Sequence, residues 1–151
     1  MRQVGQVMFT GEYRHAIDGK GRLAVPARFR ARLDGGAYVA QWIDGCLGLF
    51  PRTAFEALAE RVAARPVTDA NARAFARSVF AGAFEVELDG QGRILLPAGL
   101  RTWAGIAGEA IVVGAVERVE LWAPGRWTAY RAAQAVDEPD IFAQRLQDLG
   151  I

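Results

Sequence analysis

Two segments of this chain, 71 positions apart, spell nearly the same tight turn. Residues 17–26 read IDGKGRLAVP, and residues 88–97 read LDGQGRILLP. Each segment places an aspartate, two glycines, an arginine and a closing proline at equivalent positions. Such an internal repeat predicts a fold in which two copies of one small unit occupy related places.

The residues that lead into each turn alternate between apolar and polar side chains. Residues 12–17 read EYRHAI and residues 83–88 read AFEVEL, and we expect Phe84, Val86 and Leu88 to face the interior. A period of two with one apolar face is typical of a half-buried strand. The glycines of each turn supply the positive φ angles that a tight hairpin needs. Each repeat is therefore predicted to open with a β-hairpin.

A proline ends each hairpin and introduces a short helix. Pro26 and Pro97 cannot donate to a strand ladder, and their fixed φ suits the start of a helix. We expect helices over residues 27–33 and 98–104, and then two further strands and a longer helix in each repeat. A linking helix is expected over residues 68–79, and a final helix at the C-terminus. The sequence thus predicts an α+β chain of two tandem ββαββα modules.

Length and composition limit the class of protein. A chain of 151 residues with 52% hydrophobic residues fits one domain, or two small domains that share a core. Its single cysteine, Cys46, cannot form an internal disulfide, and its apolar neighbours predict a buried, unreactive thiol. The longest apolar run, residues 110–116, is too short to span a bilayer, and the N-terminus lacks a signal-peptide pattern. We expect a cytoplasmic protein without membrane contact.

The charge is distributed unevenly along the chain. The net charge is only +1, but residues 9–33 carry six cationic side chains against two carboxylates, a local charge of +4. From residue 134 onward, one arginine faces four carboxylates, a local charge of −3. A local positive potential attracts polyanions. The first repeat is therefore the expected site of such contact.

The residues that catalysis requires are scarce. His15, the one histidine, falls within a strand pattern and has no serine or cysteine signature beside it. One histidine and one cysteine are too few for a zinc site, and Lys20 is followed by glycine rather than by the Ser/Thr-headed helix of a phosphate loop. Glu85 and Glu87 share the solvent face of a strand, which favours solubility over metal binding. We expect no enzyme activity, no cofactor, no metal and no small-molecule substrate.

The tryptophans offer a second possible site. Trp42, Trp103, Trp122 and Trp127 could form a stacking platform for nucleic-acid bases. Most of them lie at positions that the strand and helix patterns assign to the interior. Core packing is therefore the favoured interpretation.

The arginine just past each turn has two interpretations. In the architectural one, Asp18 bonds the turn backbone and pairs with Arg22 only to hold the loop. In the functional one, the carboxylate fixes a guanidinium at the lip of the hairpin, where it meets phosphates or a guanine edge. The surrounding charge favours the functional interpretation for the first hairpin, and both stay open for the second. Arg28, Arg30 and Arg32 are expected on a helix near the same face.

The two turns resemble the Asp-x-x-x-Arg signature of the MraZ family. DGKGRLAVP and DGQGRILLP carry it here, and the segments MFTGEY, IVVGAVERVELWAPGRW and RLQDLG resemble other landmarks of that family. The likeness covers nearly the whole chain from Met8. It implies two AbrB-like swapped-hairpin modules that form one pseudo-twofold β-barrel with peripheral helices. The expected segments are an N-terminal extension (1–7), a first module (8–64), a bridging helix (65–79), a second module (80–136) and a C-terminal helix (137–151).

The resemblance implies a bacterial DNA-binding transcriptional regulator that is associated with the nucleoid. It implies a homo-oligomeric ring that binds double-stranded promoter DNA with repeated short boxes, at the division and cell-wall gene cluster. It implies no enzyme activity and no cofactor. Together with the local charge, it gives these candidate DNA-binding residues: Asp18, Lys20, Arg22, Arg14, Arg28, Arg30, Asp89 and Arg93.

The second hairpin and the C-terminus bear on the alternatives. Gln91 stands where the first turn has Lys20, so we expect substitution of Arg93 to weaken DNA binding less than substitution of Arg22. The competing function is a protein-interaction or antitoxin-like AbrB-type module. A free basic tail would favour an antitoxin, whereas this C-terminus is acidic and predicted to be helical.

Overall fold

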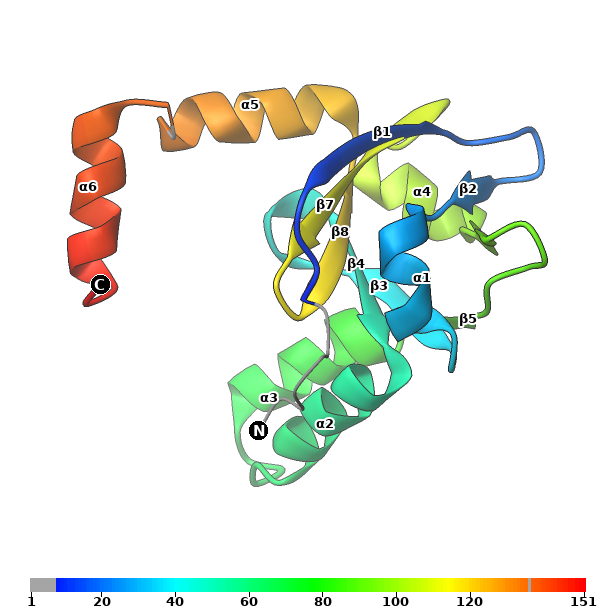
Figure 1. The fold of residues 1–151 in the computed structure, drawn as a ribbon. Coiled ribbons are helices and arrows are strands. Elements are labelled where there is room, and N and C mark those ends of the chain that lie inside the picture. Colours follow the sequence, from blue (N-terminus) through cyan, green and yellow to red (C-terminus); the bar gives the residue numbers. More distant parts are fainter. Residues whose placement is uncertain (1–7, 136) are drawn as a thin grey trace.

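The computed structural model describes residues 8–135 and 137–151 (Figure 1). The extension expected over residues 1–7 lies outside the described residues. The strands are β1 (Glu12–Ala16), β2 (Arg22–Ala24), β3 (Ala37–Gln41), β4 (Leu47–Pro51), β5 (Phe84–Val86), β6 (Arg93–Leu95), β7 (Glu109–Ala115) and β8 (Arg118–Trp122). The helical elements are α1 (Ala27–Leu33), η1 (Ile43–Gly45), α2 (Arg52–Ala63), α3 (Ala70–Phe75), η2 (Ala76–Phe80), α4 (Ala98–Ala104), α5 (Pro124–Gln134) and α6 (Pro139–Asp148).

The strands of the two repeats interleave in one antiparallel sheet. Its order is β1-β7-β8-β4-β3-β5, and β2 and β6 pair with each other in a separate two-stranded sheet. Strand β1 of the first repeat pairs with β7 of the second, and β5 of the second pairs with β3 of the first. The other contacts between the repeats join equivalent strands, β4 with β8 and β2 with β6. The repeats are therefore related by an approximate twofold axis, and each gives its first strand to the other.

The six-stranded sheet is open, with β1 and β5 at its edges, and does not close into the barrel expected from the sequence. Closure would need longer ladders from β2 and β6, but each of these strands has three residues. Between β1 and β2, the described pairing is a bridge from Ile17 to Leu23. Pro26 and Pro97 follow the short strands and cannot donate to a longer ladder. The two hairpins therefore pair with each other and leave the sheet open.

Both repeats supply one hydrophobic core. Its largest fully buried side chains include Leu23 and Ile94 from the hairpins, Phe29 from α1, and Leu49 and Leu121 from the central strands. Burial of such side chains is the main favourable contribution to folding. The returning strand of each hairpin is therefore fixed by the core that the two repeats share.

Two aromatic clusters lie outside this core, one under each long helix. Phe55 of α2 packs against Phe50 and Tyr38, with ring centroids 5.3 and 4.8 Å apart. Trp127 of α5 packs against Trp122, with centroids 5.2 Å apart. These contacts anchor α2 and α5 at equivalent places in the two repeats.

Burial follows the sequence pattern at most positions and departs from it at the edge of the sheet. Val86 is buried and Leu88 is half-buried, as expected, but Phe84 is 51% exposed. Phe84 begins the short edge strand β5, where only β3 lies beside it, so the interior position predicted for Phe84 is wrong. Trp103 of α4 is likewise exposed, whereas Trp122 is buried as expected.

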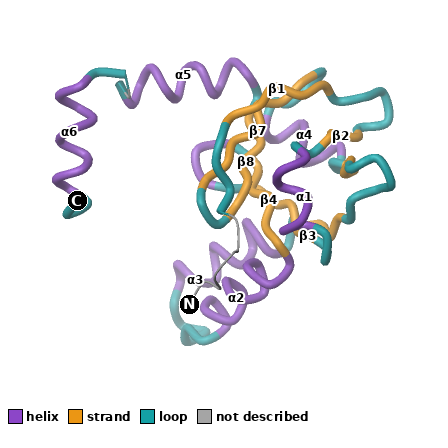
Figure 2. Tube along the Cα trace, in the orientation of Figure 1, coloured by secondary structure: helices purple, strands orange, loops and turns teal. Residues whose placement is uncertain are grey.

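The helices that follow α2 and α5 differ between the repeats. In the first repeat, α3 begins after Asp69, whose Oδ1 accepts a hydrogen bond from the Ala72 N–H at 3.1 Å, and lies beside α2 (Figure 1). The expected linking helix is thus present as α3 and η2. In the second repeat, α6 stands apart from the sheet and is joined to the body through α5 (Figure 2). None of the helices within the described residues is long and apolar enough to cross a bilayer.

Candidate nucleic-acid interface

The two hairpins lie side by side at one end of the molecule, and their loops project toward the same side (Figure 1). We call residues 17–25 and 88–96 together the paired hairpins. Strands β2 and β6 run antiparallel within them, with Leu23 opposite Ile94. Both of these side chains are buried in the hydrophobic core, which stabilises the pairing of the two strands.

The turn of each hairpin is bonded to the strand of the other. The Val25 N–H donates to the Gly92 carbonyl, and the Leu96 N–H donates to the Gly21 carbonyl, both at 2.9 Å. These two bonds are copies of each other, because the shift that aligns the two repeats exchanges their members. The hairpins therefore form one surface rather than two independent loops.

Asp18 organises the first turn. Its Oδ1 accepts hydrogen bonds from the backbone N–H groups of Lys20 and Arg22, both at 2.9 Å, and its Oδ2 accepts one from Arg22 Nε at 2.7 Å. The Gly21 N–H donates to the Asp18 carbonyl at 3.0 Å and closes the turn. A carboxylate with these three donors shapes the turn and orients the guanidinium at the same time.

Asp89 makes the same contacts in the second turn. Its Oδ1 accepts from the N–H groups of Gln91 and Arg93, and its Oδ2 accepts from Arg93 Nε, all at 2.9 Å. The backbone contacts and the aspartate–arginine pair described by the architectural interpretation are thus present in both turns. The same contacts fix the direction in which each arginine leaves its turn.

Hydrogen-bond donors lower the pKa of both aspartates. The Arg22 N–H is the largest cause for Asp18, and with the Arg22 side chain and the Lys20 N–H it lowers the pKa of Asp18 to about 2, against an opposing contribution from desolvation. The Arg93 N–H likewise lowers the pKa of Asp89. Both carboxylates are ionised at neutral pH, so each aspartate–arginine contact is charge-assisted.

A second pair of arginines supports the turns. Arg30 of α1 and Arg101 of α4 each donate from Nε to a backbone carbonyl at the end of their own hairpin, at 2.8 and 3.1 Å. The guanidinium of Arg30 lies against Gly92, and that of Arg101 lies against Gly21. Each arginine therefore contacts the turn of the other repeat. Arg30 is among the residues predicted from the sequence, whereas Arg101 is not, although the two occupy equivalent positions of the repeats.

Glycine is required at both of these contacts. Gly21 and Gly92 have φ angles of +82° and +74°, which side-chain-bearing residues rarely adopt. A Cβ at Gly21 would lie 3.0 Å from an Arg101 nitrogen, and one at Gly92 would overlap the Arg30 guanidinium. The backbone conformation therefore requires glycine at both positions, and at Gly92 a side chain would also displace the Arg30 guanidinium.

These side chains make one positive surface, which we call the basic cluster. Five cations and two carboxylates give it a net charge of +3: Lys20, Arg22, Arg30, Arg93 and Arg101 against Asp18 and Asp89. One nitrogen of Arg93 lies 3.8 Å from Asp18 Oδ2, so the second arginine reaches the first turn. The side chains of Arg22 and Arg93 are 31% and 26% exposed. Positive charge therefore comes from both repeats and not from the first alone.

Comparison with protein families identifies this repeated arrangement. The family model described as "MraZ protein, putative antitoxin-like" matches residues 8–78 and matches again over residues 79–149. The chain belongs to the MraZ family. The two matches divide it into the same two repeats that the paired turns define.

Curated relatives of this MraZ family chain match it over nearly its full length. A protein of Thermomicrobium roseum named transcriptional regulator MraZ is 51% identical over 142 residues, which is 94% of this chain and 99% of the relative. A protein of Desulfitobacterium hafniense with the same name is 48% identical over 144 residues, 95% of this chain and 100% of the relative. One from Pelotomaculum thermopropionicum, again so named, is 43% identical over 144 residues, 95% of this chain and 99% of the relative.

In this MraZ family chain, two other predicted DNA-binding residues lie outside the basic cluster. Arg14 of β1 pairs with Glu109 and borders a hollow beside Trp127 of α5. A nitrogen of Arg28 approaches the Tyr13 hydroxyl at 3.5 Å. The structure therefore brings together Asp18, Lys20, Arg22, Arg30, Asp89 and Arg93, and leaves out Arg14 and Arg28.

Arg28, Arg30 and Arg32 were expected on a helix near the face of the first turn, but only Arg30 reaches the hairpins. Residues two apart on an α-helix point about 200° apart, which turns Arg30 away from the other two. The Arg32 guanidinium lies over the Phe9 ring, 4.5 Å from its centroid, and 3.7 Å from Glu117. Arg32 therefore covers the core, while Arg30 supports the hairpins.

The other residues considered for catalysis are buried, packed or paired within the fold. Cys46 is buried as predicted, its Sγ donates to the Ile43 carbonyl at 3.3 Å, and burial raises the pKa of the thiol. His15 is half-buried in β1, and Glu85 pairs with Arg52. Across residues 8–135 and 137–151, no group of three His, Cys, Asp or Glu side chains is arranged to hold a metal ion.

Proposed function

We propose that this chain is a DNA-binding transcriptional regulator and that the paired hairpins are its DNA-binding surface. The observation that carries the proposal is the basic cluster, in which both repeats contribute an aspartate-held arginine to one surface. The curated relatives are named transcriptional regulators and not enzymes. Their names are also the ground for expecting no enzyme activity here.

The geometry prepares Arg22 and Arg93 for contact with DNA. An aspartate engages Nε of each, so the terminal nitrogens of the guanidinium can donate to a ligand. A planar guanidinium matches the oxygens of a phosphate or the O6/N7 edge of guanine. Since each side chain is already held before binding, less conformational entropy is given up when the contact forms.

Asp18 and Asp89 act through the arginines in this proposal. A carboxylate repels phosphate, so these two residues position the guanidinium and do not touch the DNA backbone. Lys20 is exposed at the tip of the first turn and adds a phosphate contact there. Gln91 occupies the equivalent place in the second turn and adds only a neutral donor.

The surroundings of Arg93 reduce the difference that was expected between the hairpins. Glu85 and Glu87 precede the second turn and would keep phosphates away from Arg93, but the carboxylate of Glu85 is engaged by Arg52. Arg93 itself lies next to the first turn. We therefore propose that both arginines contact DNA, with the difference between Lys20 and Gln91 as the remaining asymmetry.

We further propose that the chain acts as a homo-oligomeric ring on the nucleoid in the cytoplasm. Its target is a promoter with repeated short boxes at the division and cell-wall gene cluster. A net charge of +1 and one small basic cluster give a single copy only weak and salt-sensitive binding. Several copies on one assembly make each further contact at high effective concentration. Repeated boxes in the DNA suit repeated hairpin pairs in the protein.

The exchange of β1 and β5 between the repeats supports a description of the modules as AbrB-like swapped hairpins. In this description the modules are residues 8–64 and 80–136, with residues 65–79 as the bridge and residues 137–151 as the C-terminal helix. The competing function is a protein-interaction or antitoxin-like AbrB-type module. The basic cluster would then contact an acidic protein, and the parent would bind no promoter duplex.

The test is a fluorescence anisotropy titration of a labelled promoter duplex at two salt concentrations. Arg22→Ala and Arg93→Ala should each weaken binding by about 1 to 3 kcal/mol for each guanidinium removed from the DNA, and each should reduce the salt slope by about 1. These effects multiply when several copies contact the same DNA. Size-exclusion chromatography should show unchanged assembly for both variants.

Arg77→Ala is the matched control. Arg77 is an exposed arginine of η2, on the side of α2 and α3, so its removal changes the net charge equally without touching the hairpins. This variant should bind like the parent. If Arg22→Ala and Arg93→Ala also bind like the parent, the paired hairpins are not the DNA-binding surface.

A further inference from the structure

Helix α6 presents an apolar face that its own chain leaves uncovered. Phe142 and Leu149 are 57% and 73% exposed, Ile141 is exposed, and only Leu146 within the helix is half-buried. The described link to the body is a hydrogen bond from Arg145 to the Gln134 carbonyl at the end of α5, at 2.8 Å. An amphipathic helix gains stability mainly by burying such a face against another element.

The first repeat indicates what the counterpart of α6 does. Helix α3 follows α2 in the first repeat as α6 follows α5 in the second, and the two family matches, residues 8–78 and 79–149, each include this helix. Phe75 packs against the aromatic cluster under α2, with its ring centroid 6.0 Å from those of Trp42 and Phe80. Helix α3 therefore packs through Phe75 against its own chain, whereas its counterpart α6 extends away from α5 (Figures 1 and 2).

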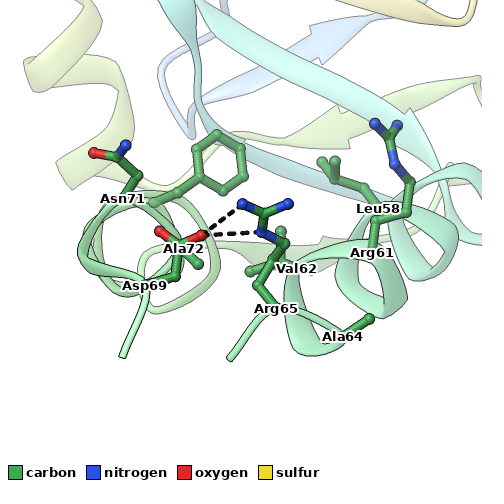
Figure 3. A pocket seen from close by; sticks show the side chains of 9 residues that line it. Leu58, Arg61, Val62, Ala64, Arg65, Asp69, Asn71 and Ala72 are labelled. Carbon is green, nitrogen blue, oxygen red and sulfur yellow. Dashed lines mark hydrogen bonds and ion pairs between the residues drawn. The ribbon is translucent and has the colours of Figure 1, made fainter. Parts of the chain in front are cut away.

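A groove of suitable chemistry lies between α2 and α3. It encloses about 650 Å³, and Leu58, Val62 and Phe75 give it an apolar lining. Arg61 and Arg65 lie along its α2 side, and the Arg65 guanidinium is held by Asp69 across the opening (Figure 3). We call this hollow the α2–α3 groove.

The charges of the groove and of α6 are opposite. Residues 52–80 carry five arginines against three carboxylates, a charge of +2. Residues 137–151 carry one arginine against four carboxylates, a charge of −3. Arg61 has no ion-pair partner within the described residues, and Asp140 and Asp148 lie in the first and last turns of α6. Apolar lining and charge therefore match between the two surfaces.

We propose that α6 of one copy docks in the α2–α3 groove of the next copy. Trp127 and Tyr130 anchor α5 on Trp122, and α5 holds α6 apart from α2 and α3 (Figure 1), which favours a second copy over the same chain. A helix-to-groove contact joins two different surfaces, and such head-to-tail contacts generate rings when the rotation closes. The inference rests on the self-association in the proposed function and identifies the contact that carries it.

The test uses two charge-reversed chains and sedimentation velocity. The groove variant is Arg61→Glu with Arg65→Glu, and the helix variant is Asp140→Arg with Asp148→Arg. Each variant alone repels its own copies and should need at least about tenfold more protein than the parent to assemble, which is about 1.4 kcal/mol. An equimolar mixture should assemble like the parent, because each groove then finds an oppositely charged helix. Phe142→Ser should weaken assembly without altering α2 or α3.

Several results would overturn the inference. Either charge-reversed variant could assemble alone like the parent, or Phe142→Ser could do so. The mixture could fail to restore assembly. A chain with all four reversals could regain the parent's compactness and stability alone while the mixture stays dissociated, which would show docking within one chain. A monomeric parent would remove both the ring and this contact, whereas DNA binding by the paired hairpins is measured separately by anisotropy.

Discussion

At the scale of single residues, one carboxylate in each hairpin both stabilises the turn and orients the arginine. Asp18 and Asp89 each accept two backbone N–H groups and one guanidinium Nε. Asparagine would keep one accepting oxygen but remove the charge that strengthens these bonds and holds the guanidinium. The turn and the DNA contact therefore depend on the same ionised group.

Asp18→Asn should lower stability at neutral pH and reduce its pH dependence in acid. The pKa of Asp18 is depressed from 3.8 to about 2 in the folded chain. Its ionised form therefore contributes stability that is complete above about pH 4 and disappears as the pH falls toward about 2. Thermal unfolding of parent and variant across this range measures the effect. The difference in Tm should shrink as the pH falls, and a constant difference would contradict this role.

Gly92→Ala should destabilise the paired hairpins by more than about 2 kcal/mol. The left-handed backbone costs a side-chain-bearing residue about 1–2 kcal/mol, and the new Cβ also displaces the Arg30 guanidinium. Gly90→Ala is the control, since a Cβ there meets no atom within 4 Å, and it should change stability by less than about 0.5 kcal/mol. Denaturant unfolding at fixed protein concentration compares the two. Equal destabilisation would show that neither the left-handed backbone nor the Arg30 contact requires glycine at position 92.

At the scale of elements, the two hairpins work as one because β2 pairs with β6. Each strand is too short to be stable alone, and each turn accepts a hydrogen bond from the other strand. The approximate twofold axis places Lys20 and Gln91 at equivalent tips. The hairpins therefore differ at their tips by one charge on an otherwise shared surface.

The tips give a reciprocal prediction. Gln91→Lys should strengthen DNA binding and raise the salt slope by about 1, because it adds a phosphate contact to the second hairpin. Lys20→Gln should weaken binding and lower the slope by a similar amount. Anisotropy titrations of one duplex at several salt concentrations measure both changes. If Gln91→Lys leaves the slope unchanged, the second tip does not face DNA.

The hairpins, the helices after each proline and the twofold repetition could be predicted from alternation, turn glycines and the constant spacing between the repeats. The pairing of β2 with β6 could not, since contacts between distant short strands leave no local pattern. The directions of Arg14 and Arg32 depend on partners far along the chain, Glu109 and Glu117. Arg101 could have been predicted from the sequence, because the same shift that aligns the turns aligns Arg101 with Arg30.

At the scale of the whole molecule, binding strength depends on repetition. The fold places the paired hairpins at one end, with α2, α3 and α6 away from them (Figure 1). Assembly through α6 therefore leaves the DNA-binding surface of every copy open. The open sheet and the position of α6 could not be predicted from the sequence. For α6 the reason is that an amphipathic helix has the same sequence pattern whether its apolar face contacts its own chain or another chain.

Phe142→Ser should separate assembly from DNA contact. The variant keeps both hairpins, so a short duplex with one box should bind it as it binds the parent. A duplex with several boxes should bind the variant with an affinity about 10²–10⁴-fold lower than the parent's, because linked contacts usually raise affinity by this factor. Anisotropy with the two duplexes measures the ratio. Equal ratios for variant and parent would show that linked contacts do not strengthen binding.

The central claim is that the two hairpins form one DNA-binding surface. Hydrogen–deuterium exchange of the parent with and without the promoter duplex tests it directly, because it reads both hairpins in one sample. The account predicts that peptides covering residues 17–25 and 88–96 gain protection together on DNA binding, while peptides from α2 and α3 do not. Protection confined to the first hairpin, or located on α2 and α3, would contradict it.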